Sequence, residues 1–396
     1  MFIEKGKIDC QPIEVGYDKT REDALLKHFE RMIEKDEIQA ASYCVARKGK
    51  VILHGAIGPR SYEENCTEPL RPDSVHCIYS ITKMVTAVAI MKLIEDGYAR
   101  LDDFVGSILP QMAKPPFDKI TIFQLLSHTS GLRSDMGAFP DEYFVGPWAC
   151  IEKIHKMTEN KEEFDWLSAA LHCGMTKRPG EEWQYCTFGF TILGAIIEKL
   201  SGQFAHDYIL EHILKPLQMN DTNFTISKDM ASRMIYRDEK QKKKMQEVAE
   251  GKRHGDFDAG TIWERIPDTG RGLYSTPYDL VRFGQMMLGN GRLGDVRILG
   301  RKTIEKMTTC SLHNIPDHCW ASEEMNRQYG VGVDMRQGLA YHYSDGTFLH
   351  EGYGACDLVI DPKEELVAAW FVPYTHDQWY AHGLYNVINI IWSGLI

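Results

Sequence analysis

The sequence contains ten cysteines but no C-x-x-C pair and no cysteine spacing typical of a zinc site. It also has no apolar run long enough to cross a bilayer and no apolar stretch behind a basic start. We therefore expect neither a membrane span nor a signal peptide. Thiols without a pairing pattern suit a reducing compartment, because a secreted protein would risk their oxidation. These absences predict a cytoplasmic protein.

Basic residues are fewer than acidic residues. Lysine and arginine number 45 against 56 aspartates and glutamates, which gives a formal net charge of -11. Nucleic acids and anionic membranes favour concentrated positive surfaces, so we expect no nucleic-acid partner and no membrane partner. With 396 residues and a hydrophobic fraction of 43%, the chain can form one large domain or two lobes. Its oligomeric state is not indicated by these numbers.

Hydrophobic periodicity predicts the main elements. Apolar residues at helical spacing predict helices over residues 22–38, 84–95, 120–127, 190–201, 277–288 and 378–392. Strand-type composition predicts a hairpin of 41–46 with 51–55, and further strands at 329–335, 340–344, 355–360 and 366–372. The lysine-rich stretch 228–258 is interpreted as a solvated surface segment.

The order of these elements predicts an α+β fold in which both chain ends contribute to one antiparallel sheet. Residues 1–75 and 265–396 would form the sheet lobe, flanked by helices from both ends of the chain. Residues 76–264 would form a mostly helical second lobe. A cleft between two lobes is a common position for an active site, and we expect the active site there.

Ser80 and Lys83 form an S-x-x-K pair at the start of an apolar helix. Residues three apart share one helix face, so the hydroxyl and the amine can come within hydrogen-bonding reach. An alcohol needs a base to act as a nucleophile, and burial lowers the pKa of a lysine toward that of a useful base. The helix N-terminus adds partial positive charge near a developing oxyanion. Such a pair arises by chance about once in a chain of this length, so its surroundings decide.

Five segments surround this pair in order along nearly the whole chain: SITKMVTA (80–87), LLSHTSGL (125–132), PGEEWQY (179–185), GLYST (272–276) and HEG (350–352). Together they resemble the serine β-lactamase and penicillin-binding-protein superfamily. The branch that they resemble most holds class C β-lactamases, family VIII esterases and D-peptidases. The resemblance implies a β-lactamase/transpeptidase-like fold and a serine hydrolase that forms an acyl-enzyme at Ser80 without a metal or an organic cofactor.

The resemblance also implies that Tyr185 is the tyrosine of the family's Y-x-N motif. A phenol beside a lysine ammonium has a lowered pKa, so Tyr185 can act as a base for Ser80 and as an acid for the leaving group. The alternative is that Tyr185 merely packs beneath the next helix. The motif's asparagine is replaced by Thr187, whose hydroxyl is shorter than an amide. We expect this change to affect β-lactam and peptide recognition more than simple ester hydrolysis.

His350-Glu351-Gly352 stands where class C enzymes have K-T-G and related esterases have H-x-G. The resemblance implies an edge strand that lines the substrate, with Gly352 allowing its backbone to approach closely. It also implies an oxyanion hole made by the N–H groups of Ser80 and Tyr353. A metal site at His350 is disfavoured because no H-E-x-x-H pattern is present, which leaves a surface histidine as the main alternative.

Two other features are interpreted as structural. His128 suggests a Ser-His-Asp triad, but the sequence contains no G-x-S-x-G, which disfavours an α/β-hydrolase. Phe144, Trp148 and Trp166 could overhang the cleft and select the acyl group. Aromatic residues at this spacing are more often part of a core.

The favoured function is hydrolysis of a small ester or a peptide-like metabolite. A D-peptidase, a β-lactamase or an acyltransferase of the same fold is the first alternative. A penicillin-binding or sensor module that does not turn over is the second, and Thr187 motivates it. A purely structural role is difficult to reconcile with Ser80, Lys83 and Tyr185 together.

Overall fold

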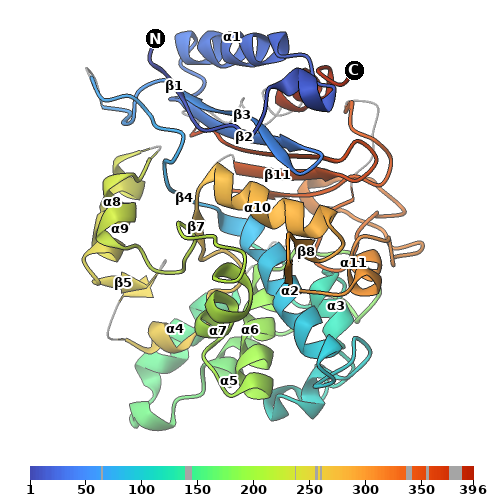
Figure 1. Cartoon of the computed structure of the whole chain (residues 1–396). Helices are drawn as coiled ribbons and strands as arrows, with labels where there is room; N and C mark the ends of the chain where they lie inside the picture. The colour runs from blue at the N-terminus through green and yellow to red at the C-terminus, as the bar shows by residue number, and fades with distance from the viewer. Residues whose placement is uncertain are drawn as a thin grey trace.

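The chain is described by a computed structural model that covers residues 1–63, 66–138, 145–236, 238–254, 257–258, 261–335, 341–353, 356–373 and 386–396. Within these ranges, one antiparallel sheet has the strand order β1-β3-β2-β12-β11-β10. The strands are β1 (Ile3–Lys5), β2 (Ala41–Arg47), β3 (Lys50–Ile57), β10 (Phe348–Gly352), β11 (Cys356–Asp361) and β12 (Leu366–Phe371). Figure 1 shows that strands from both ends of the chain form this single sheet. The predicted α+β fold, with one antiparallel sheet built from both chain ends, is confirmed.

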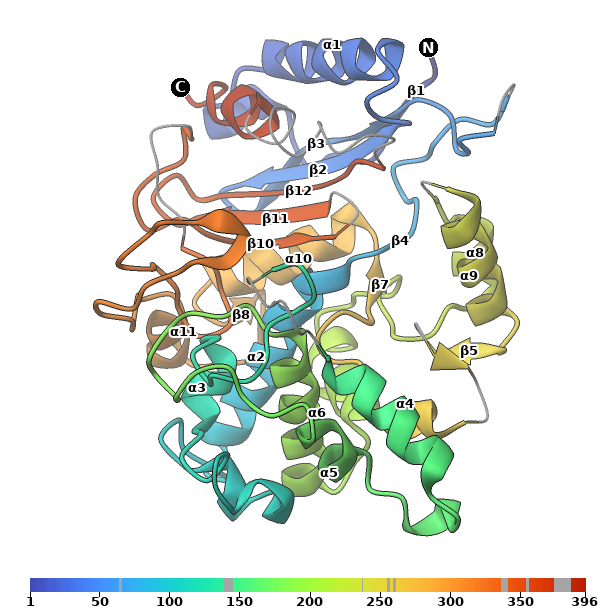
Figure 2. The same cartoon turned by 180° about the vertical axis from the view of Figure 1, so that it is seen from behind.

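The two halves of the sheet meet where β2 pairs with β12, with Val45 opposite Ala368. The predicted hairpin of β2 and β3 turns at Lys48 and Gly49, which have φ angles of 49° and 74°. Two successive left-handed residues give the type I′ turn that matches the twist of paired strands. β10 is the last strand of the sheet, beside β11 (Figure 2).

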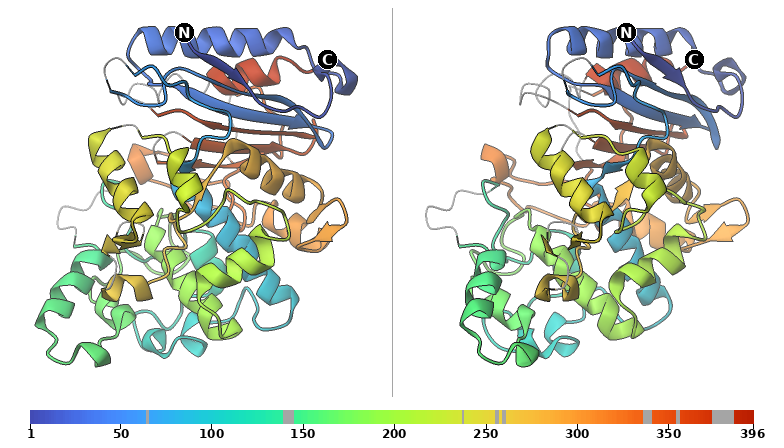
Figure 3. Two further views of the ribbon diagram at one scale, coloured as in Figure 1. Left: turned by 60° about the vertical axis from the view of Figure 1, so that its left-hand side comes forward. Right: turned by 90° about the vertical axis from the view of Figure 1, so that its left-hand side faces the viewer.

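Helices cover both faces of the sheet, as the side views in Figure 3 show. α1 (Thr20–Glu34) and the last helix, residues 386–392, pack on one face in a core that includes Phe29, Trp370 and Trp392. On the other face, α10 (Pro277–Leu288) begins at Thr276, whose side chain accepts the N–H of Asp279. This bond satisfies one of the orphan N–H donors of the first turn.

The remaining helices form the part of the molecule below the sheet in Figure 1. They are α2 (Thr82–Glu95), α3 (Ile122–Leu126), α4 (Pro147–Met157), α5 (Trp166–Leu171), α6 (Thr187–Ser201), α7 (Ala205–Ile209), α8 (Lys228–Ser232), α9 (Glu239–Ala249) and α11 (Arg301–Met307). Short paired strands lie among them: β4 (His76–Cys77) with β7 (Tyr274–Ser275), β5 (Arg253–His254) with β6 (Phe257–Asp258), and β8 (Arg292–Leu293) with β9 (Val296–Arg297). One apolar core runs from α2 and α6 to the inner face of the sheet. The boundaries of the two predicted lobes stay a prediction.

Two predicted strands are wrong. Residues 329–335 form a turn held by isolated bridges from Asp334 to Tyr329 and to Leu349. Gly332 has a φ of 73° and lies against Ala87 of α2, so the alternating residues reflect packing on a helix rather than pairing in a ladder. Residues 341–344 also form no strand, while residue 340 lies outside the described residues. Tyr341 and Tyr343 are instead stacked, with ring centroids 4.7 Å apart.

The lysine-rich stretch is more ordered than predicted, because it contains α8 and α9. Gln241, Met245 and Val248 of α9 are buried at helical spacing, and the two apolar ones share a small core with Val75 and Tyr274. Lysines on the other faces concealed this apolar side in the sequence. Among the described helices, none is long and apolar enough to cross a membrane.

Candidate active site

Ser80 lies in a 3₁₀ turn, η2 (Tyr79–Ile81), that leads directly into α2. Tyr79 has a φ of 43°, a conformation that costs a bulky residue energy and that must be imposed by its surroundings. Two hydrogen bonds hold this segment: Ile78 N–H donates to Leu273 O over 2.9 Å, and Gln241 of α9 donates to Tyr79 Oη over 3.1 Å. The nucleophile candidate is therefore held in a fixed position at the N-terminus of a buried helix.

Lys83 is fully buried one turn after Ser80. Its Nζ lies 3.0 Å from Ser80 Oγ, 3.1 Å from Thr187 Oγ1 and 2.9 Å from the carbonyl oxygen of Gly270. An ammonium has three N–H donors, and these three acceptors match them. The predicted contact between Ser80 and Lys83 is thus present.

Burial lowers the pKa of Lys83 from its usual 10.5 to about 8. The carboxylate of Asp135 opposes this shift, and Arg271 adds to it. No carboxylate contacts Nζ among the described residues, so desolvation has the larger effect. A lysine with such a pKa is partly neutral in mildly alkaline solution and can accept a proton from Ser80.

Tyr185 lies beside the same ammonium, with its ring centroid 4.8 Å from Lys83 Nζ. Its carbonyl oxygen accepts a 2.6 Å hydrogen bond from Ser134 Oγ and a 3.0 Å bond from Asp135 N–H. Residues 134–135 therefore hold the backbone that presents Tyr185. The structure brings Ser80, Lys83 and Tyr185 together as the sequence predicts, while the catalytic role of Tyr185 stays a prediction.

Thr187 is the first residue of α6 and connects Lys83 to a residue that sequence reasoning missed. Its hydroxyl donates to Asp135 Oδ2 over 2.5 Å, and its N–H donates to Asp135 Oδ1 over 2.7 Å. Asp135 belongs to none of the matched motifs. Its position shortly after the HTSGL segment is the only signal that could have drawn attention to it.

β10 reaches the site through Gly352. A Cβ atom at this position would lie 2.4 Å from Ile78 O and 2.3 Å from Cys356 Sγ, so only glycine permits this approach. His350 is buried on the same strand, and its ring centroid lies 6.4 Å from that of Tyr185. Tyr353 is 60% exposed and meets the ring of Tyr79 edge-on at 5.8 Å. The oxyanion-hole role of its N–H stays a prediction.

His128 lies buried behind Tyr185, with ring centroids 4.6 Å apart. Its Nδ1 accepts the N–H of Cys186 over 3.1 Å. Burial, with a contribution from the positive charge of Lys83, holds the pKa of His128 well below its usual range. This neutral ring holds the backbone N–H of Cys186, directly after Tyr185, in agreement with a structural interpretation.

The aromatic residues divide between core and surface. Trp148 and Trp166 both meet the buried Phe188 edge-on, at 5.6 and 6.3 Å, which favours the core interpretation. Phe144 lies outside the described residues. Trp320 was missed: it is 61% exposed, has a φ of 51° and lies 5.2 Å from the ring of Tyr185.

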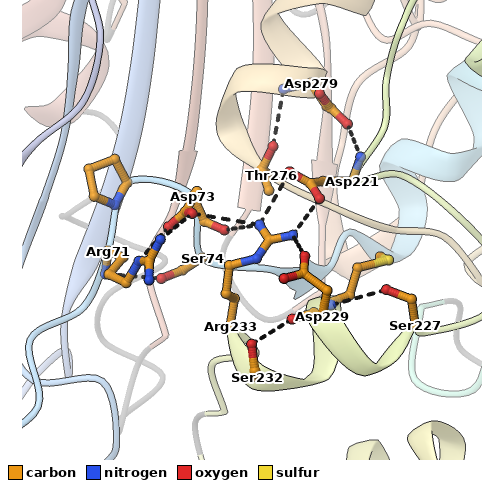
Figure 4. Close-up of polar contacts among 12 residues, drawn as sticks. Arg71, Asp73, Ser74, Asp221, Ser227, Asp229, Ser232, Arg233, Thr276 and Asp279 are labelled. Atoms are coloured by element: carbon orange, nitrogen blue, oxygen red, sulfur yellow. Dashed lines mark hydrogen bonds and ion pairs between the residues drawn. The ribbon is translucent and has the colours of Figure 1, made fainter.

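A network around Arg233 anchors the chain that leads to Ser80 (Figure 4). Arg233 donates to Asp221 and Asp229 over 2.5 Å and to the carbonyl oxygen of Asp73 over 2.7 Å. Its own carbonyl oxygen accepts the N–H of Val75, directly before β4. These carboxylates raise the pKa of Arg233 further, against the effect of burial.

The part of the chain that the structure describes contains no group of three or more histidines, cysteines or acidic residues placed to hold a metal ion. The polar groups around Ser80 instead suit a proton transfer between side chains. Lys83, Thr187 and Asp135 form one connected set of hydrogen bonds that begins at the Ser80 hydroxyl.

Comparison with known proteins identifies the family and the fold of the chain. The sequence model of the family described as Beta-lactamase matches residues 25–386. Penicillin-binding protein 4* of Bacillus subtilis (strain 168) is 32% identical over 194 residues, which are 49% of this chain and 40% of that protein. The chain thus spans less than half the length of this curated relative.

Two solved structures share the fold over nearly the full length of both chains. EstCE1, "a hydrolase with promiscuous acyltransferase activity", superposes with a TM-score of 0.71 at 19% identity, covering 94% of this chain and 99% of EstCE1. A family VIII carboxylesterase superposes with a TM-score of 0.68 at 18% identity, covering 98% of this chain and 100% of the other. At these identities the likeness concerns the fold alone.

Proposed function

The chain belongs to the Beta-lactamase family, and on this premise we propose that it is a serine esterase that forms an acyl-enzyme at Ser80. Its substrate is a small ester or a peptide-like metabolite. The observation that carries the proposal is the 3.0 Å contact between Ser80 Oγ and the buried Lys83 Nζ, since the pKa of this lysine is lowered to about 8.

The reaction proceeds in two steps. The Ser80 hydroxyl passes its proton to Lys83 and its oxygen bonds to the substrate carbonyl carbon, forming an oxyanion. The N–H groups of Ser80 and Tyr353 stabilise that charge at the end of β10. Tyr185 donates its phenol proton to the leaving alcohol as the carbonyl re-forms, and the proton that Lys83 accepted from Ser80 passes to Tyr185. Water then cleaves the acyl-enzyme by the reverse sequence of proton transfers.

The ester preference is supported by the hydrogen bonds of Thr187. Its single hydroxyl proton is donated to Asp135, so Thr187 has no side-chain donor left for a substrate amide. An asparagine at this position would offer two donors and an acceptor. Recognition of a β-lactam or peptide side chain is weakened by this exchange, whereas the ester carbonyl at Ser80 is unaffected.

The proposal includes a cytoplasmic location and no nucleic-acid or membrane partner. The net charge of -11 supports the absence of such partners, because both are polyanionic. The scattered cysteines support the location, and none is paired among the described residues. The chemistry requires neither a metal nor an organic cofactor, because proton transfer and attack use side chains only.

Mass spectrometry after treatment with a fluorophosphonate tests the nucleophile. We expect one adduct per chain, on Ser80, and none in Ser80→Ala. Labelling that persists in Ser80→Ala overturns the assignment.

Turnover of p-nitrophenyl butyrate, a chromogenic cephalosporin and a D-Ala-D-Ala peptide tests the substrate class. We expect the ester to turn over fastest. Cleavage of the peptide alone contradicts the ester preference. A stable adduct on Ser80 without any turnover would indicate a binding module instead.

A further inference from the structure

The hydroxyl of Thr187 has a defined direction. An ionised carboxylate only accepts hydrogen bonds, so the 2.5 Å contact between Thr187 Oγ1 and Asp135 Oδ2 uses the hydroxyl proton of Thr187. The oxygen of Thr187 is then left as an acceptor toward Lys83 Nζ, 3.1 Å away. Because of Asp135, Lys83 donates and Thr187 accepts in the hydrogen bond between them.

The second neighbour of Lys83 is equally fixed. The carbonyl oxygen of Gly270, 2.9 Å from Nζ, can only accept. A Cβ atom on Gly270 would lie 2.7 Å from Thr187 Cγ2, so the residue must be glycine for its carbonyl to sit this close to Thr187. Two of the three groups around Lys83 are thus acceptors in every protonation state of the lysine.

This arrangement has a consequence for neutral Lys83. A neutral amine has two N–H donors and one free electron pair. If Gly270 and Thr187 both accept, the two protons point at them and the electron pair points at the third neighbour, Ser80 Oγ. Ser80 is also the only one of the three neighbours with a proton to give.

We propose that Asp135 is a positioning residue that, through the hydroxyl of Thr187, directs the free electron pair of Lys83 at Ser80. The inference rests on the proposed function, in which Lys83 takes the proton of Ser80. Asp135 and Thr187 together set the orientation of the base, Lys83. Thr187 stands where the family's motif has asparagine.

Asp135 also has a structural role from which this one must be separated. Its Oδ1 accepts the first N–H of α6, where the N-cap residue Cys186 makes no side-chain cap. Loss of a cap costs about 1 kcal/mol of stability. Variants are therefore needed that retain the cap and change only the direction of the hydroxyl.

Asp135→Asn meets this requirement. Its Oδ1 can still accept the N–H of Thr187, but its NH₂ group donates to Thr187 Oγ1 and turns the hydroxyl proton toward Lys83. That proton then competes with Ser80 for the electron pair. Thr187→Val removes the hydroxyl and keeps the carboxylate, and Thr187→Ser keeps both. Asp102→Asn, at a side chain that is 78% exposed, removes one negative charge elsewhere.

We expect kcat/KM for p-nitrophenyl butyrate to fall about 100-fold in Asp135→Asn, the loss typical of a misdirected catalytic group. It should fall roughly 10-fold in Thr187→Val and less than about 3-fold in Thr187→Ser and Asp102→Asn, since only a fraction of that positioning is lost. The acid limb of the pH profile should move to lower pH in Asp135→Asn, because the charge that raises the pKa of Lys83 is gone. A cap alone would not move this limb.

Three results would overturn the inference. They are an Asp135→Asn variant as active as Thr187→Val, an acid limb that does not move, and a loss that merely follows the fraction of folded protein. NMR titration of ¹³Cε-labelled lysine, with the Lys83 signal assigned by Lys83→Arg, needs no turnover. If the wild type cleaves no ester, the proposed function fails. An unchanged Lys83 titration in Asp135→Asn defeats the inference by itself.

Discussion

Two buried cations in this protein have opposite surroundings. Lys83 is fully buried among a hydroxyl, a second hydroxyl and a carbonyl, and its pKa falls to about 8. Arg233 is 9% exposed and contacts the carboxylates of Asp221 and Asp229 directly, and its pKa is raised. The carboxylate of Asp135 is linked to Lys83 by hydrogen bonds through the hydroxyl of Thr187.

Burial has a different consequence for each of the two cations. Direct carboxylate partners compensate the desolvation of Arg233 and keep it charged, so it can hold residues 73–75, which precede Ser80 in the chain (Figure 4). Neutral partners leave the desolvation of Lys83 largely uncompensated, so its proton is exchangeable. One cation organises the backbone, and the other is suited to chemistry.

The largest effect is expected when Lys83, whose ammonium can lose its proton, is replaced by arginine, which stays charged. Lys83→Arg should reduce kcat/KM for p-nitrophenyl butyrate about 1,000-fold or more, because a guanidinium keeps its proton at any accessible pH. Lys83→Met is the matched variant without a charge and should lose as much. Activity of the arginine variant within about 10-fold of the wild type would show that Lys83 is not the base.

A smaller effect, on stability, is expected when the charge of Arg233 is removed. Arg233→Met should lower the free energy of unfolding by about 2–4 kcal/mol, because Asp221 loses its buried partner. Urea unfolding measures this loss. Arg71→Met, at a pair whose side chains are 60% and 40% exposed, should cost less than about 1 kcal/mol. Equal losses in the two variants would refute the distinction.

The pH profile tests the exchangeable proton in the unmodified protein. With the pKa of Lys83 at about 8, the neutral fraction rises as pH rises through that value. The value of kcat/KM should therefore increase roughly 50-fold between pH 6 and pH 8 and level off above pH 9. A flat profile over this interval would place the working base elsewhere.

The smallest effect concerns Asp279, an acid in the same network as Arg233. Burial raises its pKa from 3.8 to about 6, so the folded state binds more protons than the unfolded state between these values. Stability from this group is present below pH 4 and is lost as pH rises through 6. Asp279→Asn should raise the free energy of unfolding by about 1 kcal/mol at pH 8.

The same variant should have no such benefit at pH 4, where Asp279 is already largely protonated in the folded state. The amide oxygen of the asparagine can still accept the N–H of Asp221 and the hydroxyl of Thr222, which Oδ2 accepts in the wild type. Thermal unfolding at both pH values provides the comparison. An equal gain at pH 4 and pH 8 would contradict a titration effect.

Local sequence patterns were sufficient for much of the fold. The hairpin of β2 and β3, helices α2, α6 and α10, and the strands β11 and β12 were predicted close to their observed bounds, because each has a clear period and a clear turn or cap. The failures at 329–335 and 341–344 have one cause. Alternating apolar residues can be buried against helices or other side chains without pairing in a ladder.

At the site, the motifs located Ser80, Lys83, Tyr185, Thr187 and Gly352, which the structure brings together at the start of α2. They could not locate Asp135, Gly270 or Trp320, because these residues act through position rather than through a recognisable pattern. Asp135 lies 52 positions before Thr187 in the sequence, and the contact between them exists only after the chain has folded. Their roles depend on distances that no local window contains.

Because the sheet combines strands from both chain ends, β10, which lies beside Ser80, is synthesised long after Ser80. His350 and Gly352, which complete the wall beside Ser80, follow it by about 270 positions, and β12 joins β2 later still. At roughly 5–20 residues per second, a ribosome needs roughly 15 to 50 s to add that segment. Throughout this interval the S-x-x-K helix can form without its opposing strand. Ser80 is thus synthesised long before β10, and an interrupted chain carries Ser80 without the strand that lies beside it.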